Sequence, residues 1–155
     1  EEFKEISFEA SEAGLPSVLW SYPRGPNIDK KSETSIDIIA YAAHIAALLG
    51  AHIIKVKPPS SSVTNSELKK QYSEFFSNID SLSERIKHIK KSAFNSKKLV
   101  VFSGGNAKGT QEMLEEIEQI KDGGGNGSII GRNTFQRPRA EALQLLQSVI
   151  NIYKK

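Results

Sequence analysis

The regular alternation of helical and extended segments is the feature that most constrains the fold of this chain. Four short apolar runs with strand character are separated by stretches in which apolar residues recur at helical spacing. The strands are expected within 15–22, 50–59, 99–102 and 128–130. Alternating strands and helices form parallel sheets with right-handed crossovers. Four such units predict an α/β fold, either an open sheet or half of a (β/α)8 TIM barrel.

The segments between these strands are expected to be helical. The apolar spacing predicts helices over 3–13, 34–49, 65–93 and 110–120, with a candidate break near 78–80, and a last helix that opens at Pro138. Thr34-x-x-Asp37 matches the capping-box pattern, in which side chains satisfy the first free N–H groups of a helix. Gly14 and Gly50 are placed to end helices. The segment 131–137 is expected to be a closing loop.

The composition of the chain limits the classes of protein to which it can belong. The chain has 155 residues, enough for one domain with a core, and its 21 basic and 18 acidic residues give a net charge of only +3. We find no nucleic-acid-binding motif, no membrane-spanning run and no signal peptide. With no cysteine and only three scattered histidines, no metal site is expected. The chain begins at Glu1 rather than at methionine, and we expect it to be a piece of something longer.

The second strand carries a lysine in the middle of an apolar run. Alternation along a strand places Lys55 and Lys57 on one face and Ile54 and Val56 on the other. An ammonium group that points into a core is costly unless it is paired, hydrated or neutral. A second ammonium group nearby would favour the neutral form of Lys55, the nucleophile of Schiff-base chemistry. The alternative is that both lysines reach solvent or pair with carboxylates, and the strand taken alone favours that alternative.

Other unusual residues follow the ends of strands. They are Tyr22 and Arg24 after the first strand, Ser103, Gly104 and Gly105 after the third, and Gly131 and Arg132 after the fourth. The carboxyl ends of parallel strands meet at one rim, where active sites lie. Glycine N–H groups and helix N-termini bind phosphate there, and we weigh a phosphate site and simple turns equally. Trp20 is expected to be a core or pocket-wall aromatic residue.

Five motifs, in order along the chain, carry a family resemblance. They are WSYPRG (20–25), AYAA (40–43), LGAHIIKVK (49–57), SGG (103–105) and IGRN (130–133). Together they resemble the archaeal-type class I fructose-bisphosphate aldolases, which bacteria also carry. The ending FQR (135–137) and the long 58–98 helical insertion are more similar to the bacterial members. The resemblance covers nearly the whole chain and implies a single domain, 1–155, that supplies strands five to eight of a (β/α)8 barrel.

The resemblance also implies the roles of individual residues. Lys55 matches the Schiff-base lysine and Tyr22 the general acid/base. Substrate binding falls to Arg24, Ser103, Gly104, Gly105, Gly131 and Arg132. The implied reaction is reversible cleavage of fructose 1,6-bisphosphate into dihydroxyacetone phosphate and glyceraldehyde 3-phosphate, a cytoplasmic step of glycolysis and gluconeogenesis. It needs no metal and no cofactor, and its partner is a phosphorylated sugar rather than a nucleic acid or a membrane.

Strands one to four of the family's barrel, and an acidic residue at the end of strand one, have no match in this chain. The chain is then either a fragment of the full enzyme or a half-barrel that pairs with another half, and a homo-oligomer is expected because bare sheet edges promote association. Two other functions compete. One is a non-catalytic half-barrel that binds phosphosugars. The other is a related Schiff-base aldolase or thiolase that acts on another phosphorylated ketose.

Overall fold

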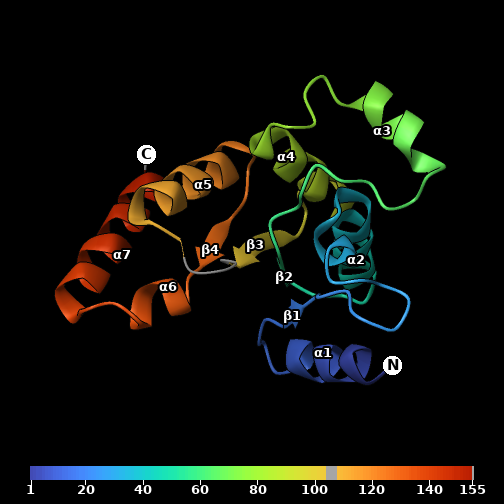
Figure 1. Ribbon diagram of the computed structural model, residues 1–155. Helices are drawn as coiled ribbons and strands as arrows, with labels where there is room; N and C mark the ends of the chain where they lie inside the picture. Colours follow the sequence, from blue (N-terminus) through green and yellow to red (C-terminus); the bar gives the residue numbers. More distant parts are fainter. Residues whose placement is uncertain (104–107, 155) are drawn as a thin grey trace.

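Four parallel strands form a single sheet in the computed structural model, which describes residues 1–103 and 108–154 (Figure 1). The strands are β1 (Val18–Trp20), β2 (Ile53–Val56), β3 (Leu99–Ser103) and β4 (Gly127–Ile129). Each strand pairs in parallel with the next one along the chain. The predicted α/β fold with a parallel sheet is therefore confirmed. Strand β1 is shorter than the predicted run because Pro16, just before it, has no N–H group to donate to a ladder.

Helices alternate with these strands along the chain. Their bounds are α1 (Glu2–Glu12), α2 (Ile36–Leu48), α3 (Leu68–Phe75), α4 (Leu82–Ser92), α5 (Thr110–Asp122), α6 (Arg132–Phe135) and α7 (Arg139–Lys154), with a 3-10 turn η1 (Ser32–Thr34). The break expected near 78–80 lies between α3 and α4. Gly14 and Gly50 follow the ends of α1 and α2 and adopt positive φ angles, as expected for residues that end helices.

Two sequence predictions about helix ends are wrong. Thr34 does not cap α2, because η1 occupies residues 32–34 and moves the start of that helix to Ile36. Asp37 is buried, and its carboxylate accepts hydrogen bonds from the backbone N–H groups of Thr64 and Asn65. It therefore anchors the linker that follows β2 instead of closing a capping box.

The second correction concerns segment 131–137, which was expected to be a loop. It contains the short helix α6, because the carbonyl of Gly131 accepts the N–H groups of Thr134 and Phe135. Pro138 directly precedes α7, where its missing N–H group costs no helical hydrogen bond.

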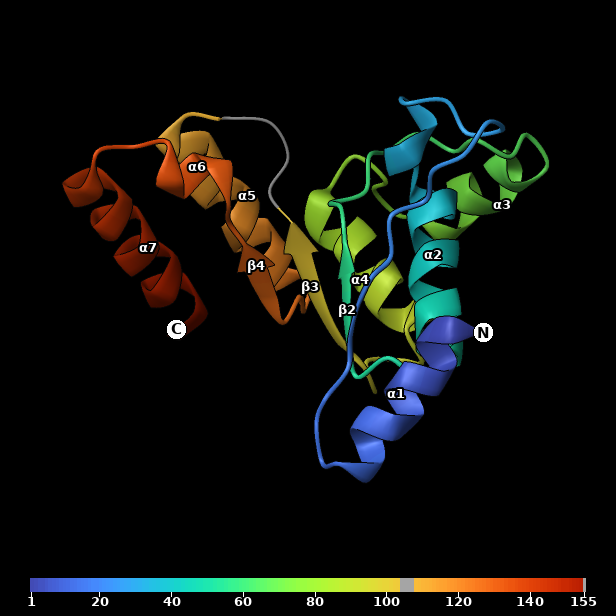
Figure 2. The same ribbon diagram turned by 90° about the horizontal axis from the view of Figure 1, so that it is seen from below.

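The two faces of the sheet differ in how they are covered. Helices α2, α4 and α5 lie along one side, and the strand residues Ile54, Val56, Val100 and Phe102 on that side are fully buried (Figures 1 and 2). The opposite face carries apolar residues that remain partly exposed: Val18, Trp20, Leu99 and Ile129. Because strand residues alternate between faces, the apolar runs on both faces indicate a sheet meant to be covered on both sides.

A second cluster of buried apolar residues joins the two helices beyond β3. Met113 and Ile117 of α5 pack against Leu145, Val149 and Ile152 of α7. Helix α7 thereby extends the helical layer past the edge of the sheet that β4 forms (Figure 2). None of the helices in the described ranges has the length and apolar character needed to cross a bilayer.

Candidate active site

Lys55 occupies the third position of β2, and its side chain is only 5 % exposed. Its Nζ lies 3.3 Å from the centroid of the Trp20 ring and 5.5 Å from that of Tyr22. No ion pair within the described ranges includes Lys55. The amine is therefore held among aromatic rings rather than beside a carboxylate, which is the buried arrangement considered for a nucleophile.

Strand register explains why these three residues meet. Trp20 is the direct neighbour of Lys55 across the β1–β2 pair, so the two side chains leave the same face of the sheet. Tyr22 lies two residues further, with its ring 6.2 Å from that of Trp20. Trp20 is 62 % exposed and so is not a core residue. It forms one wall of the lysine's surroundings, in agreement with the pocket-wall alternative.

Lys57 directly follows β2 and has a different environment from Lys55. Its Nζ lies 2.6 Å from Oε2 of Glu33, which η1 brings to the end of the strand. The hydrogen bond from Lys57 holds the pKa of Glu33 below its ordinary value, and the charge of Arg24 acts in the same direction. Of the two lysines, Lys57 pairs with a carboxylate, whereas Lys55 takes part in no described ion pair. Sequence reasoning did not identify Glu33.

Arg24 lies exposed in the loop that follows β1. Together with Trp20 and Tyr22 it lines a hollow of about 420 Å³ beside that strand, whose other wall is formed by residues of α2 such as Ile38 and Tyr41. The loop therefore brings Arg24 to the same wall as Tyr22. The hollow runs along the free edge of the sheet, where β1 has no further strand beside it.

The predicted phosphate-binding residues lie at the carboxyl ends of β3 and β4. Ser103 ends β3, and its hydroxyl donates to the carbonyl of Val56 on the neighbouring strand over 3.3 Å. Ser103 also pairs with Ile129, which places Gly131 and Arg132 at the same rim of the sheet. Gly131 directly precedes α6, and Arg132 is its first residue. Gly104 and Gly105 lie outside the described residues.

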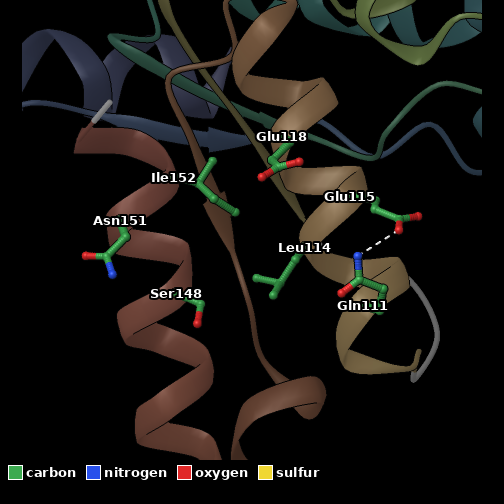
Figure 3. A pocket seen from close by; sticks show the side chains of 7 residues that line it. All are labelled: Gln111, Leu114, Glu115, Glu118, Ser148, Asn151 and Ile152. Atoms are coloured by element: carbon green, nitrogen blue, oxygen red, sulfur yellow. Dashed lines mark hydrogen bonds between the residues drawn. The ribbon is translucent and has the colours of Figure 1, made fainter.

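A further hollow lies between α5 and α7, away from the predicted site (Figure 3). Its volume is about 260 Å³, and Glu115, Glu118, Ser148 and Asn151 line it. The Gln111 side chain there donates to Glu115 over 2.8 Å. None of the predicted catalytic or substrate-binding residues that the structure describes lies in it. Within the described residues, no group of three or more His, Cys, Asp or Glu side chains is placed to hold a metal ion.

The geometry brings an amine and a phenol together, with Ser103, Gly131 and Arg132 at neighbouring strand ends of the same parallel sheet. Known structures share this architecture, and the α/β fold with its parallel sheet is similar to that of the aldolase TIM barrels. An archaeal fructose-1,6-bisphosphate aldolase, whose catalytic lysine is covalently bound to the carbinolamine intermediate of its substrate, superimposes with a TM-score of 0.76 at 28 % sequence identity. The alignment covers 99 % of this chain and 51 % of that one.

Sequence comparison identifies the family. Residues 1–137 match the family described as DeoC/LacD family aldolase, and the chain belongs to that family. The class 1 fructose-bisphosphate aldolase of Halobacterium salinarum is 34 % identical over 151 residues, which are 97 % of this chain and 48 % of the relative. A fructose-bisphosphate aldolase/6-deoxy-5-ketofructose 1-phosphate synthase of Methanocaldococcus jannaschii is 32 % identical over 153 residues, 98 % of this chain and 42 % of the relative. The chain thus spans about half the length of these relatives.

Proposed function

We propose that this chain is the Schiff-base-forming half of a class I fructose-bisphosphate aldolase. The proposed reaction is the reversible cleavage of fructose 1,6-bisphosphate into dihydroxyacetone phosphate and glyceraldehyde 3-phosphate. The observation that carries the proposal is Lys55, a buried amine of a parallel sheet that lies over the ring of Trp20, near that of Tyr22, and outside any described ion pair. The relatives named as class 1 aldolases support the same reaction.

The mechanism follows from the position of the amine. Neutral Nζ of Lys55 attacks the C2 carbonyl of the open-chain ketose, and the carbinolamine loses water to form an iminium ion. The iminium accepts the electron pair released when C3–C4 breaks, while a base removes the proton of the C4 hydroxyl. The resulting enamine is protonated at C3, and water then hydrolyses the imine to release dihydroxyacetone phosphate. Tyr22, whose ring lies 5.5 Å from Nζ, is the proposed proton carrier for these steps.

Substrate binding is assigned to the rim residues around this pair. Arg24, on the same wall as Tyr22, would attract a phosphate by charge. Ser103, Gly104 and Gly105 after β3, and Gly131 and Arg132 after β4, would bind the other phosphate through hydroxyl, backbone N–H and guanidinium groups. The adjacent ends of β3 and β4 support this assignment.

We further propose that the sheet supplies strands five to eight of a (β/α)8 barrel and that another half completes it. Residues 1–155 would then act as one unit, with 58–98 as an inserted helical segment. The exposed apolar face of the sheet supports this proposal, as do the apolar residues Leu143, Leu146 and Ile150 that α7 leaves exposed. A homo-oligomer and a cytoplasmic location, where the sugar phosphates of glycolysis occur, complete the proposal.

A second candidate substrate deserves a direct comparison. The name of the relative from Methanocaldococcus jannaschii includes 6-deoxy-5-ketofructose 1-phosphate synthase beside fructose-bisphosphate aldolase. A related Schiff-base reaction on another phosphorylated ketose is therefore the alternative. Cleavage rates for fructose 1,6-bisphosphate and fructose 1-phosphate distinguish the two. A strong preference for the bisphosphate supports the first candidate, because only that substrate offers a phosphate at each end.

Borohydride trapping tests the proposal. The natural full-length protein is mixed with dihydroxyacetone phosphate and borohydride, and the masses of its tryptic peptides are measured by mass spectrometry. We expect the reduced adduct on the Lys55 peptide. It should disappear in Lys55→Arg, which keeps the charge but removes the nucleophile, and it should persist in the control Lys57→Arg, because Lys57 is engaged by Glu33. No adduct in the unchanged protein, with phosphosugar binding retained, would instead favour the non-catalytic alternative.

A further inference from the structure

A network of hydrogen bonds connects helix α6 to the residues that precede α5. The N–H group of Lys108 donates to Oδ1 of Asn133 over 2.9 Å, and Asn133 is buried. The guanidinium group of Arg137 donates from Nε to the carbonyl of Asn133 over 2.6 Å. It also donates to Oγ1 of Thr110 over 2.6 Å and to the carbonyl of Lys108 over 3.2 Å. Three of these bonds therefore join two segments that are separated by more than twenty residues in the sequence, and the fourth ties Arg137 to Asn133 of α6.

The network lies beside the proposed phosphate-binding residues. Gly131 and Arg132 form the beginning of α6, and Asn133 is the residue directly after them. From the other side, Lys108 lies just before α5, and Thr110 is the first residue of that helix. The segment that carries Gly131 and Arg132 is thus held on one side by strand β4 and on the other by Asn133 and Arg137.

We propose that Arg137 and Asn133 are positioning residues for phosphate binding at the rim of the sheet. The inference rests on the proposed function and adds to it the residues that hold one phosphate-binding segment in place. Arg137 uses donors on Nε, Nη1 and Nη2 in a planar fork that a lysine cannot reproduce. Three of its five N–H groups donate to the two segments. We therefore assign it an action on the substrate through α6 and through its positive charge rather than by direct contact.

This arrangement has a kinetic consequence. The phosphate group of the substrate is bound equally in the ground state and in the transition state of carbon–carbon cleavage. A weaker phosphate site therefore lowers the affinity for the substrate without slowing the chemical step of the bound complex. Loss of Arg137 should therefore raise KM and leave kcat nearly unchanged. The affinity for inorganic phosphate should fall in parallel, because the same N–H and guanidinium groups would bind the free anion.

The test compares variants of the natural full-length protein. For each one, KM and kcat are measured with fructose 1,6-bisphosphate, and inorganic phosphate is titrated as a competitive inhibitor. We expect Arg137→Ala to raise both KM and the inhibition constant of phosphate about tenfold, since several hydrogen bonds of ordinary strength are lost. Arg137→Lys should give a smaller increase of about threefold, because one ammonium group can satisfy only part of the three acceptors.

Two further variants keep the proposal falsifiable. Arg139→Ala is the matched control, because it removes an exposed arginine two residues away and should leave both constants unchanged. Thr110→Val removes one exposed acceptor without endangering folding, and it should raise both constants about twofold. If Arg137→Ala fails to fold, Arg137→Lys and Thr110→Val decide the question by the same two readouts.

Two results would overturn the proposal. One is an unchanged phosphate inhibition constant in Arg137→Ala, Arg137→Lys and Thr110→Val. The other is a fall in kcat with KM unchanged, which would mean a role in the chemical step. Failure of the aldolase proposal is separately visible, because the unchanged protein would then form no borohydride-trapped adduct on Lys55.

Discussion

Lys55 and Lys57 show how two identical side chains, two residues apart, acquire different surroundings. Lys55 lies in β2, and Lys57 directly follows that strand. Glu33 lies against Lys57, whereas the rings of Trp20 and Tyr22 lie against Lys55. A lysine whose amine is hydrogen-bonded to a carboxylate is engaged there and is a poor nucleophile. The choice between the two candidate amines is therefore made by neighbours that come from other parts of the chain.

His88 is a second residue whose surroundings change its chemistry. It lies on α4, and its ring is 5.3–5.4 Å from the rings of Tyr72, Phe75 and Phe76. Its Nε2 lies 3.2 Å from the hydroxyl of Tyr72. Burial lowers the pKa of His88 from the ordinary value of 6.5, and the nearby charge of Lys91 lowers it further. The imidazole therefore helps to hold α3 against α4 in its neutral form.

This lowered pKa predicts a pH dependence of stability. The folded state binds a proton on His88 less readily than the unfolded state, so the stabilisation is complete above pH 6.5 and declines as the pH falls through 6.5 and below. Urea unfolding should show a lower free energy of unfolding at pH 5 than at pH 7.5. The variant His88→Phe should have a shallower dependence, and the exposed control His52→Gln should keep it. Equal slopes for His88→Phe and the unchanged protein would contradict the prediction.

At the scale of elements, Gly123 at the end of α5 lies tightly against helix α4. A Cβ atom placed there would lie 2.5 Å from Cβ of Ile86 and 2.6 Å from the carbonyl oxygen of Ser83. Ile86 is fully buried and Ser83 contributes backbone, so neither can move aside at little cost. Only glycine lets the end of α5 pack against α4 in this way.

The close approach predicts the effect of a single methyl group. Gly123→Ala should lower the free energy of unfolding by about 2 kcal/mol, the usual cost of overpacking a core. The control Gly109→Ala should change it by less than about 0.5 kcal/mol, because a Cβ there meets nothing within 4 Å and the backbone φ is negative. Urea unfolding of both variants checks the prediction. Similar values for the two variants would mean that the contact between α4 and α5 relaxes freely.

At the scale of the whole molecule, the sheet is covered on one side only. Val18 and Ile129 are 45 % and 42 % exposed on the open face, and both outer strands have a free edge. Apolar surface and unpaired strand edges drive association unless another element covers them. The proposed second half of the barrel would provide that cover.

Residues 1–155 by themselves are therefore expected to self-associate. Sedimentation should detect dimers or larger species, and a dye that binds apolar surface should fluoresce with them. A double variant with Val18→Lys and Ile129→Lys should be largely monomeric, because two charges would then have to be buried on association. A monomer at all concentrations for the unchanged residues 1–155 would show that the open face is not a binding surface.

Local patterns were sufficient to predict most of the elements. Periodicity indicated the four strands and the helices between them, because the spacing of apolar residues reports directly on strand and helix geometry. It failed at Thr34 and at segment 131–137, where turns depend on hydrogen bonds with nearby residues that periodicity does not report. The motifs from WSYPRG to IGRN also indicated the aldolase family, which the comparisons confirm.

The sequence by itself determined the α/β order, the position of Lys55 on the strand face opposite to Ile54 and Val56, and the family to which the chain belongs. Only the tertiary structure decided which groups meet there. The ring of Trp20 lies over Lys55, Glu33 pairs with Lys57, and Arg137 connects α6 to the start of α5. The physical reason is range: alternation and helical spacing act between near neighbours, whereas these contacts depend on strand register and helix packing that the whole chain sets together.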